Sequence, residues 1–135
     1  MKVAFDIGGV LSKYPDEFRE LLRMLTPSFE VFVVTDMKPK SMVMETLKLN
    51  GFGIFFNEEH VHLADFDTYG EGCKYVIYQA LEIDMVYDDH EAYLGLGGVP
   101  VRCLVMNDPY RPYWHPTWVL PEGQESNFGR RVFTR

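Results

Sequence analysis

Short apolar runs of strand length alternate along this chain with longer segments whose apolar residues recur at helical spacing. From the N-terminus the runs read KVAFDI, EVFVVTD, FGIFF, DMVYDD and VRCLVM. EVFVVTD is almost continuously apolar, as expected of a strand that is covered on both faces in a parallel sheet. Apolar strands that alternate with amphipathic helices predict an α/β fold with a central five-stranded parallel sheet and right-handed crossovers.

The helices predicted between these strands are bounded by ordinary helix breakers. One apolar stripe ends at a proline, and another is followed by Asn50 and Gly51, a C-cap signal. The stripes predict helices over residues 18–25, 41–49 and 73–81, and a brief helix is expected after DMVYDD. Residues 57–72 form a polar connection to which the pattern assigns no element.

The composition indicates one folded, soluble domain. The 135 residues suffice for a single domain, and 47% of them are hydrophobic, which excludes a disordered chain. A net charge of -7 argues against general binding to nucleic acid or acidic membranes, because phosphate backbones are held mainly by clustered Lys and Arg. Two cysteines are too few for a disulfide framework, and no apolar run reaches the length of a membrane span. We therefore expect a cytoplasmic protein.

Polar side chains that suit phosphate or metal chemistry stand where the predicted strands end. These residues are Asp6, Thr35, Asp88 and Asp89, joined by Lys74 at the start of the helix that precedes the fourth run. Taken singly, each has an ordinary explanation, because an aspartate can cap a loop, a threonine can stabilise a turn and an acidic pair can simply be solvated. Ligands of parallel sheets bind beyond the carboxyl ends of the strands, so the joint position of these residues predicts a site at that edge.

In this order the motifs resemble those of the haloacid dehalogenase-like hydrolase superfamily, over roughly residues 3–106. FDIGGVL is similar to the family's first motif, D-x-D-G-[TV]-[LV] after an apolar strand, and VFVVTD to its second, a strand that ends in Thr or Ser. Lys74 matches the third motif and MVYDD the fourth. A receiver domain also gathers acids, a threonine and a lysine, but its acidic pair comes early in the chain, so that alternative is rejected. The resemblance implies a three-layer, Rossmann-like domain with hydrolase activity.

The resemblance also implies roles for three residues in the cleavage of a phosphate monoester. Asp6 would attack the phosphorus and carry an aspartyl-phosphate. A carboxylate needs no base for this attack, because its usual pKa is about 3.9. Lys74 would stabilise the charge of the nucleophile and of the transferring phosphoryl group. Thr35 would donate a hydrogen bond to a phosphate oxygen.

The implied cofactor is Mg²⁺, which prefers oxygen ligands. They would come from the Asp6 carboxylate, the Gly8 carbonyl, and Asp89 or its neighbour Asp88. Position 8 departs from the family's phosphatases, which usually carry there a second aspartate that serves as general acid and base. Such proton transfer contributes about 10²- to 10⁴-fold in rate, so glycine keeps a carbonyl for the metal but removes the acid. The alternative function is a catalytically impaired module of the same fold that binds metal, phosphate or a partner protein.

The resemblance divides the chain into two parts. Residues 1–108 would form the α/β domain, whose connections are too short for a separate cap domain. Residues 109–135 are different in kind, because dense prolines exclude a regular helix. We expect an arm that packs on the domain, with a poorly ordered end, GRRVFTR.

The arm bears on the choice of substrate. Its aromatic residues could stack a base or bind a partner, or they could cover the sheet and extend the core. They are Tyr110, Tyr113, Trp114 and Trp118. NDPYRPYW is weakly similar to the strand-five region of capless nucleotide phosphatases, which favours a small phosphorylated substrate such as a nucleotide. A capless site suits a bulky substrate, or else is sealed by a second subunit of a homo-oligomer or by the arm itself.

Three histidines and a cysteine are weaker candidates. His60 and His62 would share a face of an extended segment, which permits a metal site, but two imidazoles without a third ligand are more often surface or turn residues. His90 follows the acidic pair and could substitute for the missing acid. Cys73 could be activated by the lysine beside it, but its place on an apolar stripe favours a packed thiol.

Overall fold

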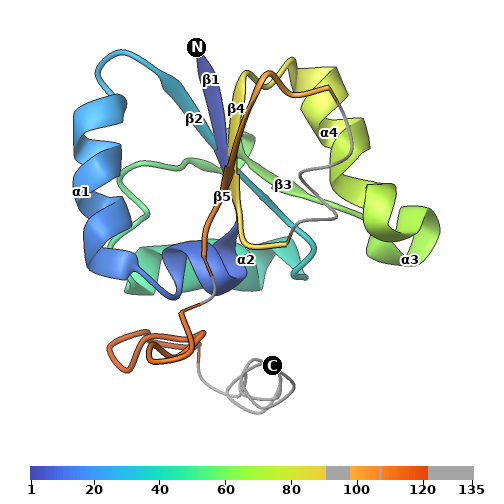
Figure 1. Cartoon of the computed structure of the whole chain (residues 1–135). Coiled ribbons are helices and arrows are strands. Elements are labelled where there is room, and N and C mark those ends of the chain that lie inside the picture. The colour runs from blue at the N-terminus through green and yellow to red at the C-terminus, as the bar shows by residue number, and fades with distance from the viewer. Residues whose placement is uncertain (91–97, 107, 122–135) are drawn as a thin grey trace.

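Five parallel strands form one sheet at the centre of the protein. The structure is a computed structural model that describes residues 1–90, 98–106 and 108–121 (Figure 1). The strands are β1 (Lys2–Phe5), β2 (Glu30–Thr35), β3 (Val61–Leu63), β4 (Met85–Asp88) and β5 (Val101–Leu104). They are arranged in the order β3-β2-β1-β4-β5, and every neighbouring pair is parallel. This arrangement confirms the predicted Rossmann-like α/β fold.

Within the described residues, three helices of nine to eleven residues connect the strands. They are α1 (Pro15–Leu25), α2 (Lys40–Leu49) and α4 (Cys73–Leu81), which confirms the three helices predicted from apolar spacing. Shorter helical turns are η1 (Ile7–Leu11), η2 (Glu58–His60), α3 (Phe66–Tyr69) and η3 (Gly70–Gly72). The brief helix expected after the fourth strand lies outside the described residues. Across the described ranges, no helix has the length and apolar character needed to cross a membrane.

Successive residues of the strands point to opposite faces of the sheet and build a separate core on each. Val3 and Phe5 of β1 belong to the core that also contains buried residues of α1 and α2. Ala4, between them, belongs to the opposite core with Tyr78 of α4. Figure 1 accordingly shows α1 on one side of the sheet and α4 on the other. The central strands are therefore buried on both faces, as the continuous apolar run of β2 predicted.

The prediction of a third strand at FGIFF is wrong, because residues 52–56 form a turn and the third strand is Val61–Leu63. Phe52 and Phe56 are buried, but Ile54 between them is 82% exposed. Positions i, i+2 and i+4 of a strand share one face, so this burial pattern is incompatible with a strand. The aromatic side chains anchor a turn to the core, and β3 forms in the polar connection where it can pair with β2.

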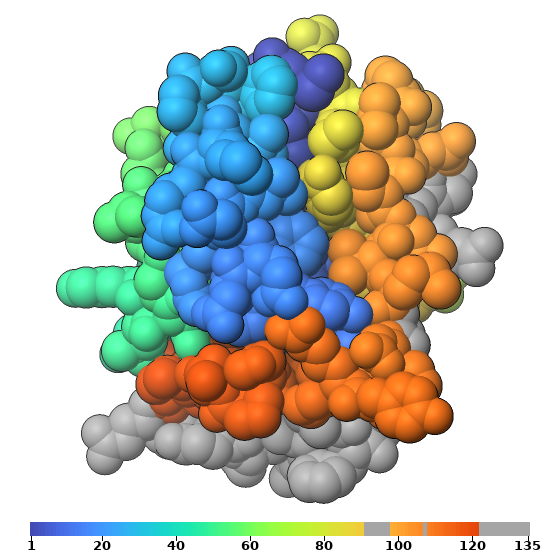
Figure 2. Space-filling model, turned by 60° about the vertical axis from the view of Figure 1, so that its left-hand side comes forward, coloured from blue at the N-terminus to red at the C-terminus, as the bar shows by residue number. Residues whose placement is uncertain are grey.

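The segment after β5 folds back beyond the carboxyl end of the sheet and packs against η1 and α1. Tyr113, Trp114 and Trp118 are buried in the same core as β1 and α1. Figure 2 shows this segment, in orange and red, against the blue surface of the first helical segments. Tyr110 differs from the other three aromatic residues, since it is 95% exposed. Three of the four aromatic residues therefore extend the core, and the expected disorder of GRRVFTR lies outside the described residues.

Candidate metal centre

Asp6 and Asp88 meet because β1 and β4 are adjacent parallel strands that end at the same level. Phe5 is paired with Tyr87, and the backbone N–H of Asp6 donates a 3.1 Å hydrogen bond to the carbonyl of Tyr87. Asp89 follows directly after β4. One carboxylate oxygen from each of the three aspartates lies within 4.8 Å of the others. The structure thus brings the predicted acidic residues together as one acidic cluster, Asp6, Asp88 and Asp89.

Lys74 is buried within this acidic cluster and contacts two of its carboxylates. Its Nζ lies 2.7 Å from Oδ2 of Asp88 and 3.2 Å from Oδ1 of Asp6. Lys74 is the second residue of α4, the helix that leads into β4. Only 1% of its side chain is exposed, so its charge depends on these partners for stabilisation.

The acidic cluster carries more negative charge than Lys74 neutralises. Burial raises the pKa of Asp6 well above its usual range, and the carboxylates of Asp88 and Asp89 add to the shift. The ammonium of Lys74 opposes it. Burial by itself would lower the pKa of Lys74, but the two neighbouring carboxylates outweigh burial and raise that pKa well above its usual range. When all three carboxyl groups are ionised, the one ammonium leaves two negative charges in excess, which one divalent cation would neutralise.

The donor chemistry of the acidic cluster fits a hard divalent cation. Mg²⁺ binds through one or a few carboxylate oxygens and keeps several of its waters. The acidic cluster supplies such oxygens close together, from two buried aspartates and a half-buried one. In the described part of the chain it is the one group of three or more carboxylate, imidazole or thiol side chains that could share an ion. The acidic cluster could therefore hold a metal, and the Gly8 carbonyl stays a predicted further ligand.

Thr35 stands at the same edge of the sheet, one strand away from Asp6. It ends β2, its side chain is fully buried, and its Oγ1 accepts a 3.2 Å hydrogen bond from the N–H of Met37. The next residue, Asp36, is close enough to raise the pKa of Asp6 further. Asp6 and Thr35 thus lie at neighbouring strand ends, and the parts that they take in a reaction stay predictions.

The two glycines after Asp6 make room for side chains from elsewhere in the chain. A Cβ on Gly8 would overlap the hydroxyl oxygen of Tyr113. A Cβ on Gly9 would overlap a carboxylate oxygen of Asp89. Gly9 also has a φ of 74°, a left-handed conformation that favours glycine, whereas the φ of Gly8 is an ordinary -65°. Close packing against Tyr113 is therefore what demands a glycine at position 8.

Ser12 ties this glycine loop to the arm. Its Oγ accepts a hydrogen bond from the N–H of Gly9 and donates one to the carbonyl of Tyr113, both at 2.9 Å. The carbonyl of Ser12 accepts a 2.7 Å hydrogen bond from the N–H of His115. Sequence reasoning missed Ser12, because its partner Tyr113 lies 101 positions away. The only sequence signal was a serine placed directly after the first motif.

Two further polar residues anchor the arm to the domain. Lys13 is 1% exposed, and its Nζ donates a 2.9 Å hydrogen bond to the carbonyl of Asp108, the residue directly before the arm. The amide of Asn50 donates to the carbonyl of Val119 at 2.8 Å and accepts from its N–H at 2.7 Å. Sequence reasoning missed Lys13 as well, since lysine is ordinarily a surface residue. The arm is thus fixed at several points along its described length.

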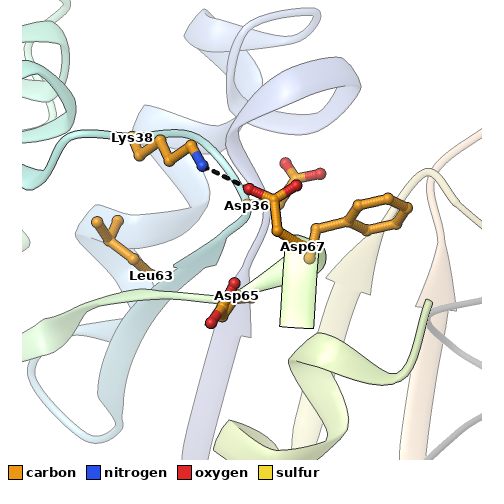
Figure 3. A pocket seen from close by; sticks show the side chains of 7 residues that line it. Asp36, Lys38, Leu63, Asp65 and Asp67 are labelled. Atoms are coloured by element: carbon orange, nitrogen blue, oxygen red, sulfur yellow. Dashed lines mark hydrogen bonds and ion pairs between the residues drawn. The ribbon is translucent and has the colours of Figure 1, made fainter. Parts of the chain in front are cut away.

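A pocket of about 310 Å³ lies at the ends of β2 and β3, near the acidic cluster (Figure 3). Asp36 lines this pocket, and its carboxylate also contributes to the raised pKa of Asp6. The charge of one pocket residue therefore acts on the acidic cluster. Lys38 reaches across to Asp67, whose Oδ2 accepts a 2.8 Å hydrogen bond from the Lys38 Nζ. The lining residues are Asp36, Lys38, Leu63, Ala64, Asp65, Phe66 and Asp67.

The weaker candidates stay outside the acidic cluster. Over the described ranges, His60 and His62 belong to no group of three metal-ligating side chains. The backbone N–H of His90 donates a 3.0 Å hydrogen bond to Oδ1 of Asp88, and His90 is exposed, so its role as a substitute acid stays a prediction. Cys73 is 1% exposed, which confirms a packed thiol.

Fold and site together define a class: a parallel, Rossmann-like α/β protein with a buried acidic cluster that could bind a metal ion. No family model, no curated protein and no solved structure matches the chain. What the protein does is therefore inferred from the chemistry of the acidic cluster.

Proposed function

We propose that this protein is a Mg²⁺-dependent phosphohydrolase of the haloacid dehalogenase-like type, which cleaves a phosphate monoester through an aspartyl-phosphate on Asp6. One observation carries the proposal: Asp6 directly follows the central strand β1, and the buried Nζ of Lys74 lies 3.2 Å from its Oδ1 inside the acidic cluster. A nucleophilic carboxylate, a fixed ammonium and acidic metal ligands are the groups that phosphoryl transfer to a carboxylate requires. The proposed substrate is a small phosphorylated molecule, and the likeness of NDPYRPYW favours a nucleotide.

The surroundings of Asp6 suit a nucleophile held in one orientation. Its Oδ1 accepts a 2.9 Å hydrogen bond from the N–H of Ile7 and lies 3.2 Å from the Nζ of Lys74. These two contacts fix Oδ1, so we assign the attack on phosphorus to Oδ2. A nucleophile fixed in this way loses little orientational freedom on the way to the transition state.

The remaining residues would stabilise charge around the transferring group. Lys74 would move part of its interaction from Asp6 to the phosphoryl oxygens as the carboxylate becomes an acyl phosphate. Thr35, at the end of the neighbouring strand, would donate its hydroxyl to another phosphoryl oxygen. Asp6, Asp88 and Asp89 would hold the metal, whose positive charge neutralises the substrate phosphate.

Turnover of phosphate esters tests this function. The purified protein with Mg²⁺ should release phosphate from p-nitrophenyl phosphate or from members of a nucleoside monophosphate panel. Asp6→Asn should reduce the rate to background, because an amide cannot form the acyl-phosphate. Asp16→Asn is the matched control, since Asp16 lies on the surface of α1 with a side chain that is 72% exposed. If the wild type releases phosphate from none of these esters, the proposal is wrong.

A non-catalytic module that binds metal and phosphate is the second candidate, and position 8 favours it. Gly8 supplies no acid, and Tyr113 fills the space of its missing side chain. Such a module would be stabilised by Mg²⁺ and inorganic phosphate together, yet would release no phosphate from any ester. Calorimetric titration of both ligands, run beside the turnover assay, separates the two functions.

A further inference from the structure

Tyr113 places its hydroxyl where the side chain of residue 8 would begin. An ideal Cβ on Gly8 would overlap this hydroxyl oxygen and would lie 2.9 Å from the Cζ of Tyr113. The ring continues over the next residue, since a Cβ on Gly9 would lie 2.6 Å from Cε2 of Tyr113. The phenol group therefore stands directly against the backbone two residues after Asp6, at the edge of the acidic cluster.

The position of Tyr113 is fixed by its surroundings. Only 8% of the residue is exposed, and its carbonyl accepts the 2.9 Å hydrogen bond from Ser12. The neighbouring Trp114 packs edge-on against its ring, with centroids 5.3 Å apart and planes at 81°. A buried ring on an anchored backbone keeps its hydroxyl in one place, which is the preorganisation that a reacting group needs.

We infer that Tyr113 is the general acid and base of this site, in place of the carboxylate that Gly8 lacks. The inference rests on the proposed phosphohydrolase function and identifies a group that the motif sequence omits. A tyrosine hydroxyl both donates and accepts hydrogen bonds, so it can deliver a proton and take one back. An alkoxide is a stronger base than a phenolate, so proton transfer from tyrosine to an alkoxide leaving group is favourable.

The two steps balance in atoms and charge. First, the Asp6 carboxylate forms a bond to phosphorus while the ester P–O bond breaks. The departing oxygen takes the Tyr113 proton. The products of this step are an alcohol, the aspartyl-phosphate and the phenolate of Tyr113. Second, the phenolate takes a proton from water as the water oxygen bonds to phosphorus. The bond between phosphorus and Asp6 then breaks, which releases phosphate and restores both the carboxylate and the phenol.

Two substrates with different leaving groups test the inference. An alkyl phosphate needs its departing oxygen protonated, whereas p-nitrophenol leaves as a stable anion. Tyr113→Phe should therefore reduce kcat/KM for the alkyl phosphate by about 10²- to 10⁴-fold and change that for p-nitrophenyl phosphate far less. Tyr110→Phe is the matched control, because Tyr110 lies three positions earlier in the same arm and is 95% exposed. It should leave both rates unchanged.

Each outcome of this experiment bears on a different claim. If the wild type turns over both esters and Tyr113→Phe loses neither or loses both equally, Tyr113 is not the general acid. If the wild type turns over neither ester, the proposed function fails and the inference fails with it. Phenylalanine keeps the buried ring, and an unchanged Tm and circular dichroism spectrum would show that Tyr113→Phe remains folded.

Discussion

The Nζ of Lys74 donates a 2.7 Å hydrogen bond to Oδ2 of Asp88, and both side chains are buried. The same Nζ lies 3.2 Å from Asp6, so one ammonium connects the ends of two neighbouring strands to the start of a helix. The ion pair is an element of the fold as well as of the candidate site. Its removal should therefore affect stability before any ligand is added.

Lys74→Met should lower the free energy of unfolding at pH 7 by about 3–5 kcal/mol. Removing one partner of a buried ion pair leaves uncompensated charge, in this case on the carboxylates of Asp6 and Asp88. Urea unfolding in the absence of divalent cations measures the change. Lys48→Met, on the exposed face of α2, is the matched control and should change stability little. Equal stability of Lys74→Met and wild type would show that the ion pair contributes nothing to the fold.

Gly8→Ala should destabilise the protein by about 1–3 kcal/mol, because the new methyl group overlaps the Tyr113 hydroxyl. The cost should shrink when Tyr113 is replaced by alanine, so a double-mutant cycle measures the steric coupling. Gly72→Ala is the control, since its Cβ would meet nothing within 4 Å and its φ is -84°. A cost of Gly8→Ala that persists fully in the Tyr113→Ala background would contradict this packing.

Mg²⁺ should raise the Tm of the wild type, and removing the metal with EDTA should reverse the increase. Binding to the folded state alone contributes about 2.7 kcal/mol at a hundredfold excess over Kd. Asp89→Asn should greatly reduce the stabilisation, because it removes one of the three carboxylates that lie within 4.8 Å of one another. Asp16→Asn should retain it. A Tm increase that is the same in Asp89→Asn and wild type would place the bound Mg²⁺ elsewhere.

The contact between Glu17 and Arg111 should make part of the stability depend on pH. Two hydrogen bonds from the guanidinium, at 2.7 and 3.1 Å, lower the pKa of Glu17 below its usual range. A carboxyl with a lowered folded-state pKa contributes stability that is present above its usual pKa and is lost as the pH falls through the lowered value.

Glu17→Gln should therefore reduce stability at pH 7 by about 0.5 kcal/mol, and the difference from wild type should vanish at acidic pH. The effect is small because about half of the Glu17 side chain is exposed, at 54%. Urea unfolding at a series of pH values measures it. Arg111→Leu should remove the same pH dependence, and a difference that stays constant down to acidic pH would contradict the expected direction of the pKa shift.

Local sequence patterns were sufficient for most of the sheet and for the acidic cluster. Asp6 and Asp88 each stand at the end of an apolar strand, and parallel strands bring such ends to one edge without any detailed packing. Lys74 was predictable because the helix that carries it leads into the strand of Asp88. FGIFF failed because short apolar runs do not distinguish a strand from a turn anchored by two buried aromatic rings.

The sequence by itself determined the parallel α/β fold and the charged residues along one edge of the sheet. Apolar runs that alternate with helical stripes, and charged residues at the ends of those runs, are patterns within short stretches of the chain. Only the tertiary structure decided why position 8 is glycine. Tyr113 reaches Gly8 through a packed arm that Ser12 holds across 101 positions of chain, and no local pattern encodes a contact of that kind. The packing of the arm against the glycine loop puts the Tyr113 hydroxyl in the space that a side chain at position 8 would occupy. A contact between segments so far apart in the chain depends on the tertiary structure.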